Sequence, residues 1–313
     1  MNTGRDRRKG VLRLRPALYI ITLLCGLVCG NAVCDPAADA DTDTALFWRI
    51  SHAEQPGGYL LGTIHSEDPR VLDFSTELVS SINACDVYAM EMVPDLPTLS
   101  RLTEYMHYQD GSTLQARIGR ERADRVKQAL ASYQVPAEWK EKMKIWAVMM
   151  TLSVPPPQTG FFMDLSLSLR AAGSGSRVTG LETLEEQLAF LENMPQDFQL
   201  ELLDQALEEF DEVAQTHKQM VDAYLSGDLG AVAQLTGEQF EQLLPAIRDY
   251  FMEQGITARN RRMVDKLAGL LHDSCVFTAV GALHLPGEAG MVSLLRARGY
   301  TLTPSPLPLN NLP

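Results

Sequence analysis

Two strand-like segments open the folded part of the chain. Apolar residues dominate LFWRIS, which starts at Leu46, and GYLLGTIH, which runs over residues 58–65, and the intervening EQPGG is a turn signal. A polar segment leads to a helical pattern over residues 76–83 and then to the apolar run DVYAMEM, near the end of which Glu91 stands. Strand, strand, helix and strand in close succession predict a mixed α/β core.

The middle of the chain has helical periodicity. Between about residues 98 and 160, GRERADRVKQALASYQ and AEWKEKMKIWAVMMTLSV carry apolar residues three and four positions apart, which predicts a helical insertion that stops at the proline run PPPQTG. FFMDLSLSLRAAGSGS predicts another helix, RVTGLET a short strand, and Thr183 with Glu186 a capping box. A long acidic helical stretch is expected from about residue 197 to residue 225.

The last third repeats the theme of the beginning. TARNRRMVDKLAGLLHDS predicts a basic helix, CVFTAVGALH a buried strand, and LPGEAGMVSLLRARGY a turn and a helix. The end of the chain, residues 304–313, is too rich in proline for a packed element. The elements together predict a single α/β (α+β) domain over residues 45–303, with a mixed central sheet flanked by helices.

The first 34 residues have the pattern of a secretory signal peptide or an N-terminal membrane anchor. Six of the 27 basic residues lie there with a single acid, followed by an uncharged, largely apolar stretch over residues 16–34, in which Gly30 and Ala32 fit a cleavage site. This predicts an exported protein of the periplasm or cell envelope that meets the membrane only through this segment. The formal net charge of −13 argues against a nucleic-acid partner, because an acidic body repels phosphate backbones.

Export also bears on the cysteines. Cys85 and Cys275 each precede an apolar strand-like run, and in an oxidising compartment they could form a single disulfide bridge. The alternative, two buried small hydrophobic side chains, is the one that the sequence favours.

Two apolar strands each run into a Gly-x-x-His motif. YLLGTIH contains Gly62 and His65, and TAVGALH contains Gly281 and His284. Because functional residues of open α/β sheets gather beyond the carboxyl ends of the strands, both imidazoles are expected at one edge of the sheet. The glycines would permit a backbone turn there that a side chain would block. The alternative is two independent strand-end histidines that are hydrogen-bonded in the core.

Glu91 favours a functional site. A carboxylate at the end of an apolar strand is costly unless it is paired or bound to a metal. His65, His284 and Glu91 would form a suitable ligand set for a divalent metal ion, with zinc, manganese and cobalt as candidates and an open position for water. Glu91 could instead act as the general base on that water. The sequence contains neither His-Glu-x-x-His nor Gly-x-Ser-x-Gly, so it offers no helical zinc-protease site and no nucleophilic serine elbow.

The basic helix supplies the candidate cation. Arg259 could stabilise a developing oxyanion or hold a substrate carboxylate, and its neighbour Asn260 could orient a ligand. Because Arg261 and Arg262 adjoin them, a solvated basic face is the simpler interpretation of this cluster.

The motifs GTIH, the strand-ending Glu91, GLETLEEQ, ARNRRM and GALHLPGEAGM together resemble the TraB/GumN family, which is related to the Tiki proteins. The resemblance covers residues 46–300 and implies two Gly-x-x-His motifs converging on the site of a metal-dependent hydrolase, since Tiki proteins are regarded as membrane-tethered metalloproteases. It implies His65, His284 and Glu91 as the centre with Arg259 beside it, and Glu182 and Gln187 as supporting residues. Ala258 stands where the family often has an acid, which leaves the partner of Arg259 open.

The leading hypothesis is therefore an exported metal-dependent hydrolase acting on peptides or proteins. One alternative keeps the site without catalysis, as a periplasmic metal- or haem-binding protein. Another is an envelope interaction protein whose methionine-rich segment, about residues 98–160, grips a peptide or partner helix.

Overall fold

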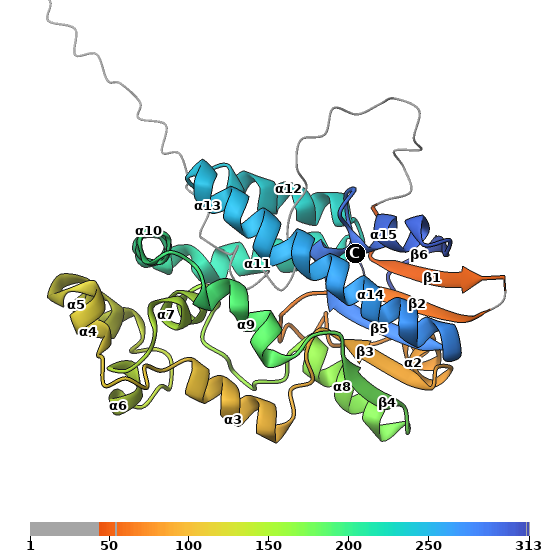
Figure 1. Ribbon diagram of the computed structural model, residues 1–313, viewed down its shortest axis with the longest axis horizontal. Coiled ribbons are helices and arrows are strands. Elements are labelled where there is room, and N and C mark those ends of the chain that lie inside the picture. Colours follow the sequence, from red (N-terminus) through yellow and green to blue (C-terminus); the bar gives the residue numbers. More distant parts are fainter. Residues whose placement is uncertain (1–43, 54, 311, 313) are drawn as a thin grey trace, which may run out of the picture.

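One mixed six-stranded sheet organises the molecule (Figure 1). The computed structural model describes residues 44–53, 55–310 and 312. The strands follow the order β4-β3-β5-β2-β1-β6, in which β4, β3, β5 and β2 are parallel and β1 and β6 are antiparallel to their neighbours. Their bounds are β1 Phe47–His52, β2 Gln55–Thr63, β3 Val87–Met90, β4 Arg177–Gly180, β5 Val276–Gly281 and β6 Thr301–Ser305. The predicted fold class, a mixed central sheet flanked by helices, is confirmed.

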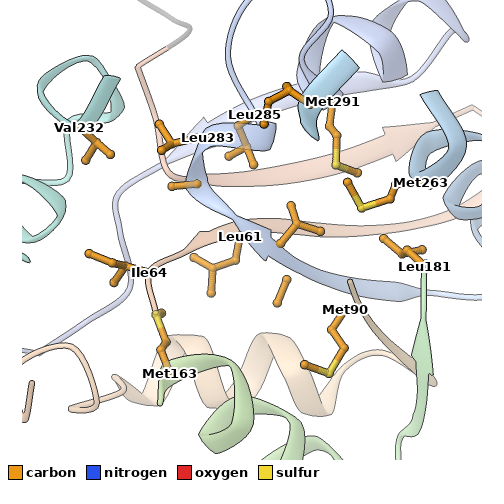
Figure 2. Packing of buried hydrophobic residues seen from close by; sticks show 14 of the residues in the cluster. Leu61, Ile64, Met90, Met163, Leu181, Val232, Met263, Leu283, Leu285 and Met291 are labelled. Carbon is orange, nitrogen blue, oxygen red and sulfur yellow. The ribbon is translucent and has the colours of Figure 1, made fainter. Parts of the chain in front are cut away.

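The central strands are apolar because helices cover both of their faces. All four residues of β3 are buried, and so are the first five of β5, as expected for parallel strands inside an α/β fold. Figure 2 shows Met163 on one side of the strands and Met263 and Met291 on the other. These methionines belong to α8 (Met163–Gly173), α14 (Ala258–Asp273) and α15 (Met291–Ala297), respectively, so these helices enclose the strand ends in the core.

The other helices surround this sheet and extend to one side of it. In Figure 1, α4 to α7 and α10 lie on the left, away from β1 and β6. The bounds are α2 Thr76–Asn83, α3 Leu96–Tyr105, α4 Leu114–Ile118, α5 Arg120–Ala129, α6 Ala137–Lys140, α7 Ile145–Leu152, α9 Leu184–Glu192, α10 Gln196–Glu208, α11 Val213–Leu225, α12 Leu229–Phe240 and α13 Pro245–Tyr250. Two 3₁₀ turns, η1 Phe210–Glu212 and η3 Ala282–His284, and the π-helical η2 Phe251–Thr257 complete the elements.

Local signals explain where several of these elements begin. The predicted capping box at the start of α9 is present, since Thr183 and Glu186 exchange side-chain and backbone hydrogen bonds. In the helical segment, Met143 and Met149 are buried core residues, and Met106 and Met150 are partly buried against the core.

The expected acidic helical stretch is present as α10 and α11, with the 3₁₀ turn η1 between them. The expectation for the end of the chain was wrong. The proline-rich end is packed against the fold. Pro304 belongs to β6, and the side chains of Leu307 and Leu309 are buried. The side-chain amide of Asn310 donates a hydrogen bond to the carboxylate of Asp73. An edge strand tolerates proline because only one of its sides pairs with a neighbour, here β1.

Cys85 and Cys275 form a disulfide bond, whereas the sequence favoured two free buried cysteines. The bond joins the residues that precede β3 and β5, and these strands are neighbours in the sheet. Adjacency of the two strands is a tertiary property, so the pairing does not follow from residues 190 positions apart.

The predicted signal peptide or anchor, residues 1–34, lies outside the described residues. Within the described ranges, no helix combines the length and the apolar character needed to cross a membrane.

Candidate functional site

Four ionisable side chains follow the carboxyl ends of four adjacent parallel strands. Glu182 comes after β4, Glu91 after β3, His284 after β5 and His65 after β2, in the order of the strands across the sheet. The register aligns Thr63 with Gly281, so the two Gly-x-x-His motifs leave the sheet at the same level. The predicted convergence at one edge of the sheet is therefore present.

The glycines of the two motifs act in different ways. Neither has a positive φ, so neither provides a left-handed turn. A Cβ on Gly62 would lie 2.9 Å from the Cα atom of Ala282, which means that only glycine lets the two motifs pack this closely. The backbone N–H of Gly281 instead donates to Oε1 of Glu91 at 2.8 Å.

Glu91 is held on both of its oxygens. Oε2 accepts hydrogen bonds from Arg259 at 2.8 Å and from Gln187 at 3.1 Å, and Oε1 accepts the bond from Gly281. The side chain is only 10% exposed. Burial raises the pKa of Glu91 to about 7; Arg259 opposes this rise and Glu182 adds to it. The carboxylate is therefore poised to gain or lose a proton near neutral pH.

Arg259 is fully buried, although its neighbours suggested a solvated basic face. Its guanidinium pairs with Glu182, at 2.9 Å from Nε and 2.5 Å from Nη2 to Oε2, as well as with Glu91. Glu182 and Glu91 are thus the partners that the sequence left open. The π-helical η2 immediately precedes α14, on which Arg259 stands, and Nη1 of Arg259 also contacts the carbonyl of Gly255 in η2. The guanidinium lies between two carboxylates and positions them.

His284 is also fully buried and is oriented by Asn260. The Asn260 amide nitrogen donates to the carbonyls of His284 and Ala289, so its Oδ1 is the atom that faces Nδ1 of His284, at 2.5 Å. Nδ1 therefore carries the hydrogen, and Nε2 is directed toward Oε1 of Glu91, 3.6 Å away. A lone pair and a carboxylate oxygen that face each other favour a shared proton or a bound cation.

His65 has a different environment. It is 44% exposed, stacks on Phe162 with ring centroids 3.8 Å apart, and has Nδ1 at 3.9 Å from Asp164. Thr63 donates to the other oxygen of Asp164 at 2.5 Å. The structure thus brings Glu91 and His284 into direct contact and orients His65 toward α8.

His65 also lines a surface pocket of about 320 Å³. Its walls include Glu67, Phe162, His217 and the proline run of residues 155–157. Nε2 of His217 lies 3.1 Å from the hydroxyl of Ser66, and burial lowers the pKa of His217 to about 4, so this imidazole is neutral at pH 7. Sequence reasoning missed His217 and Asp164, because each stands on a helix remote from both Gly-x-x-His motifs.

A family model described as the TraB/PrgY/gumN family matches residues 46–304. The chain belongs to the TraB/PrgY/gumN family.

Several relatives of this TraB/PrgY/gumN chain carry the name metalloprotease. This chain is 23% identical over 330 residues to metalloprotease TIKI2 of Danio rerio and 25% identical over 334 residues to metalloprotease TIKI1 of Homo sapiens. These matches cover 87% and 88% of this chain but only 63% and 65% of the relatives. It is also 26% identical over 257 residues to the uncharacterized protein YbaP of Escherichia coli, covering 80% of this chain and 92% of that protein. No solved structure matches.

The names of these relatives imply a metal, and the predicted ligands can be compared with that implication. Glu91 and His284 form a facing pair of donors, but His65 is directed toward Asp164. Among the described residues, no group of three or more His, Cys, Asp or Glu side chains is arranged to hold a metal ion. The three predicted ligands therefore do not fit a metal as a set in the arrangement that the structure shows.

Proposed function

We propose that this protein is a hydrolase that cleaves peptide bonds in peptides or proteins outside the cytoplasm. The observation that carries the proposal is the contact between Oε1 of Glu91 and Nε2 of His284, at the edge of the sheet where the pocket beside His65 also opens. The likeness to proteins named metalloprotease supports the reaction class. Export rests on the pattern of residues 1–34 alone.

Glu91 is the group that we assign to the proton transfer. Because burial brings its pKa to about 7, it can take a proton from water and return it to a leaving amine at neutral pH. Arg259, Gln187 and the Gly281 N–H hold the carboxylate in place throughout. His284, fixed by Asn260, adjoins the oxygen of Glu91 that exchanges the proton.

His65 is the exposed member of the site and the one that substrate can touch. Asp164 and Phe162 fix its ring from the side of α8, as Asn260 fixes His284 from α14. We assign to His65 the contact with the scissile carbonyl or with the attacking water. Arg259 then acts as a positioning residue for Glu91, in place of the oxyanion contact that its sequence position suggested.

The test is hydrolysis of an unbiased peptide library by the full chain and by two variants. Glu91→Gln keeps the shape of the side chain but cannot accept the proton, and we expect turnover to fall at least about 100-fold. His65→Ala should lower it to a similar extent, while His272→Ala, on an exposed histidine of α14, serves as the matched control. Absence of turnover in the parent, or equal turnover in the parent and Glu91→Gln, would contradict the proposal.

Elemental analysis decides the metal dependence that the relatives' names suggest. A metal that copurifies at one equivalent per chain, and is lost in Glu91→Gln but kept in His272→Ala, would show that the site uses a metal ion. Stoichiometric metal or haem without turnover would instead favour the non-catalytic binding protein.

A further inference from the structure

The pocket beside His65 has a charge that its walls do not neutralise. Glu67 and Asp68 line it, and among the described residues that line it none is lysine or arginine. Burial raises the pKa of Glu67, but backbone N–H groups of residues 158–160 outweigh this and hold the pKa below its usual value. A hydrogen bond from Arg70 likewise lowers the pKa of Asp68, so both carboxylates are ionised at neutral pH.

The neighbouring groups do not cancel this charge. His217 is neutral at pH 7. Arg70 pairs with Asp68 and Asp222, and Lys218 pairs with Asp222 as well, so these two cations face four carboxylates, those of Glu67, Asp68, Asp164 and Asp222. Of these, Asp164 lies next to His65, and 30% of its side chain is exposed. The pocket therefore has a negative potential at the point where the proposed site meets solvent.

One side of the pocket is apolar. Residues 154–157, Val-Pro-Pro-Pro, form one side, and the ring of Phe162 lies behind His65. Glu67 fixes this segment by accepting the N–H groups of Gln158, Thr159 and Gly160 at 2.9, 2.9 and 2.6 Å. Apolar walls next to carboxylates suit a side chain with an aliphatic stem and a cationic end.

From this combination we infer that the pocket binds a lysine or arginine side chain of the substrate, next to the bond that is cleaved beside His65. The inference rests on the proposed function for the cleavage, but the binding preference can be measured without it. It names a class of substrate, basic peptides, and predicts discrimination against acidic ones.

Ala214 allows a test that removes no existing side-chain contact. It is an exposed residue of α11 that lines the pocket, so Ala214→Lys adds a cation, Ala214→Glu an anion, and Ala214→Gln the same bulk without charge. The probes are Ac-Ala-Ala-Xaa-Ala-Ala-amide peptides in which Xaa is lysine, norleucine or glutamate. Cleavage is measured with each Ala214 variant, and binding by calorimetry with the same variants carrying Glu91→Gln, which is not expected to turn the peptides over.

We expect the lysine peptide to bind and react better than norleucine, and norleucine better than glutamate. Relative to Ala214→Gln, the Ala214→Lys variant should weaken the lysine peptide about 3- to 10-fold and Ala214→Glu should strengthen it, with both effects shrinking at high salt. Equal response of all three peptides to the added charge would overturn the inference. Lysine-selective binding without any cleavage would contradict the proposed function and leave the pocket assignment standing.

Discussion

Nε2 of His284 lies 3.6 Å from Oε1 of Glu91, although 193 residues separate them in the chain. Each of the two groups is fixed from behind, His284 by Asn260 and Glu91 by Arg259, Gln187 and Gly281. The contact joins the ends of β3 and β5, which are paired in parallel.

The stability of the fold should depend on the ionisation of Glu91. Its pKa is 4.5 in an unfolded chain and about 7 in the fold, so the folded state binds the proton more tightly. The protonated Glu91 carboxyl is the form that the fold favours. Its stabilising effect is complete below about pH 4.5 and is lost as the pH rises to about 7. Across that window, the free energy of unfolding of Glu91→Gln relative to the parent should rise by about 3 kcal/mol. Urea unfolding at a series of pH values checks this, and a constant difference would contradict it.

The proposed hydrolysis should have an acidic limb set by the same group. Because Glu91 must be unprotonated to act as a base, kcat/KM should fall about tenfold per pH unit below about pH 7. The limb should be absent from any residual activity of Glu91→Gln. A pH–rate profile of the parent that stays flat down to pH 5 would assign the proton transfer to another residue.

Removing Arg259 should destabilise the protein more than removing the nearby Arg261. Arg259→Met leaves Glu91 and Glu182 buried without their shared cation, which costs about 3–5 kcal/mol. The double variant Arg259→Met with Glu182→Gln should recover part of this loss. Arg261→Met, at a side chain that is 62% exposed, should change the stability by less than about 0.5 kcal/mol. Chemical denaturation gives both values, and a loss at position 259 as small as the one expected at position 261 would show that the network adds no stability.

The close packing of the two histidine motifs can be tested at Gly62. Gly62→Ala forces the backbone at Ala282 to move, and we expect a loss of about 1–3 kcal/mol together with reduced turnover. Gly269→Ala is the matched control, because this exposed helical glycine has open space around its Cα; there we expect a gain of up to about 1 kcal/mol. Thermal unfolding of both variants gives the comparison, and an unaltered midpoint for Gly62→Ala would contradict the tight approach.

The bond between Cys85 and Cys275 should contribute to stability by cross-linking distant parts of the chain. The variant with both cysteines changed to alanine should lose about 2–4 kcal/mol under oxidising conditions. Treatment with a reductant should lower the unfolding midpoint of the parent and leave that of the variant unchanged. Identical midpoints of oxidised parent and variant would show that the bond is without effect.

From the sequence alone, the elements and a set of candidate site residues could be predicted. Apolar periodicity predicted strands and helices near their observed positions, and the glycine, histidine and carboxylate residues at strand ends indicated His65, Glu91 and His284 as candidates. Buried parallel strands need apolar residues on both faces. A polar residue at the end of such an apolar run therefore stands out in the sequence.

The tertiary structure alone decided which of these residues meet. Strand order put Glu91 beside His284 and Cys85 beside Cys275, and the packing of α14 buried Arg259 between two carboxylates instead of in solvent. Asp164 and His217 entered the site from helices whose local sequence is that of ordinary amphipathic helices. Neighbourhood across a sheet depends on pairing between distant segments, and no local pattern of side chains encodes it.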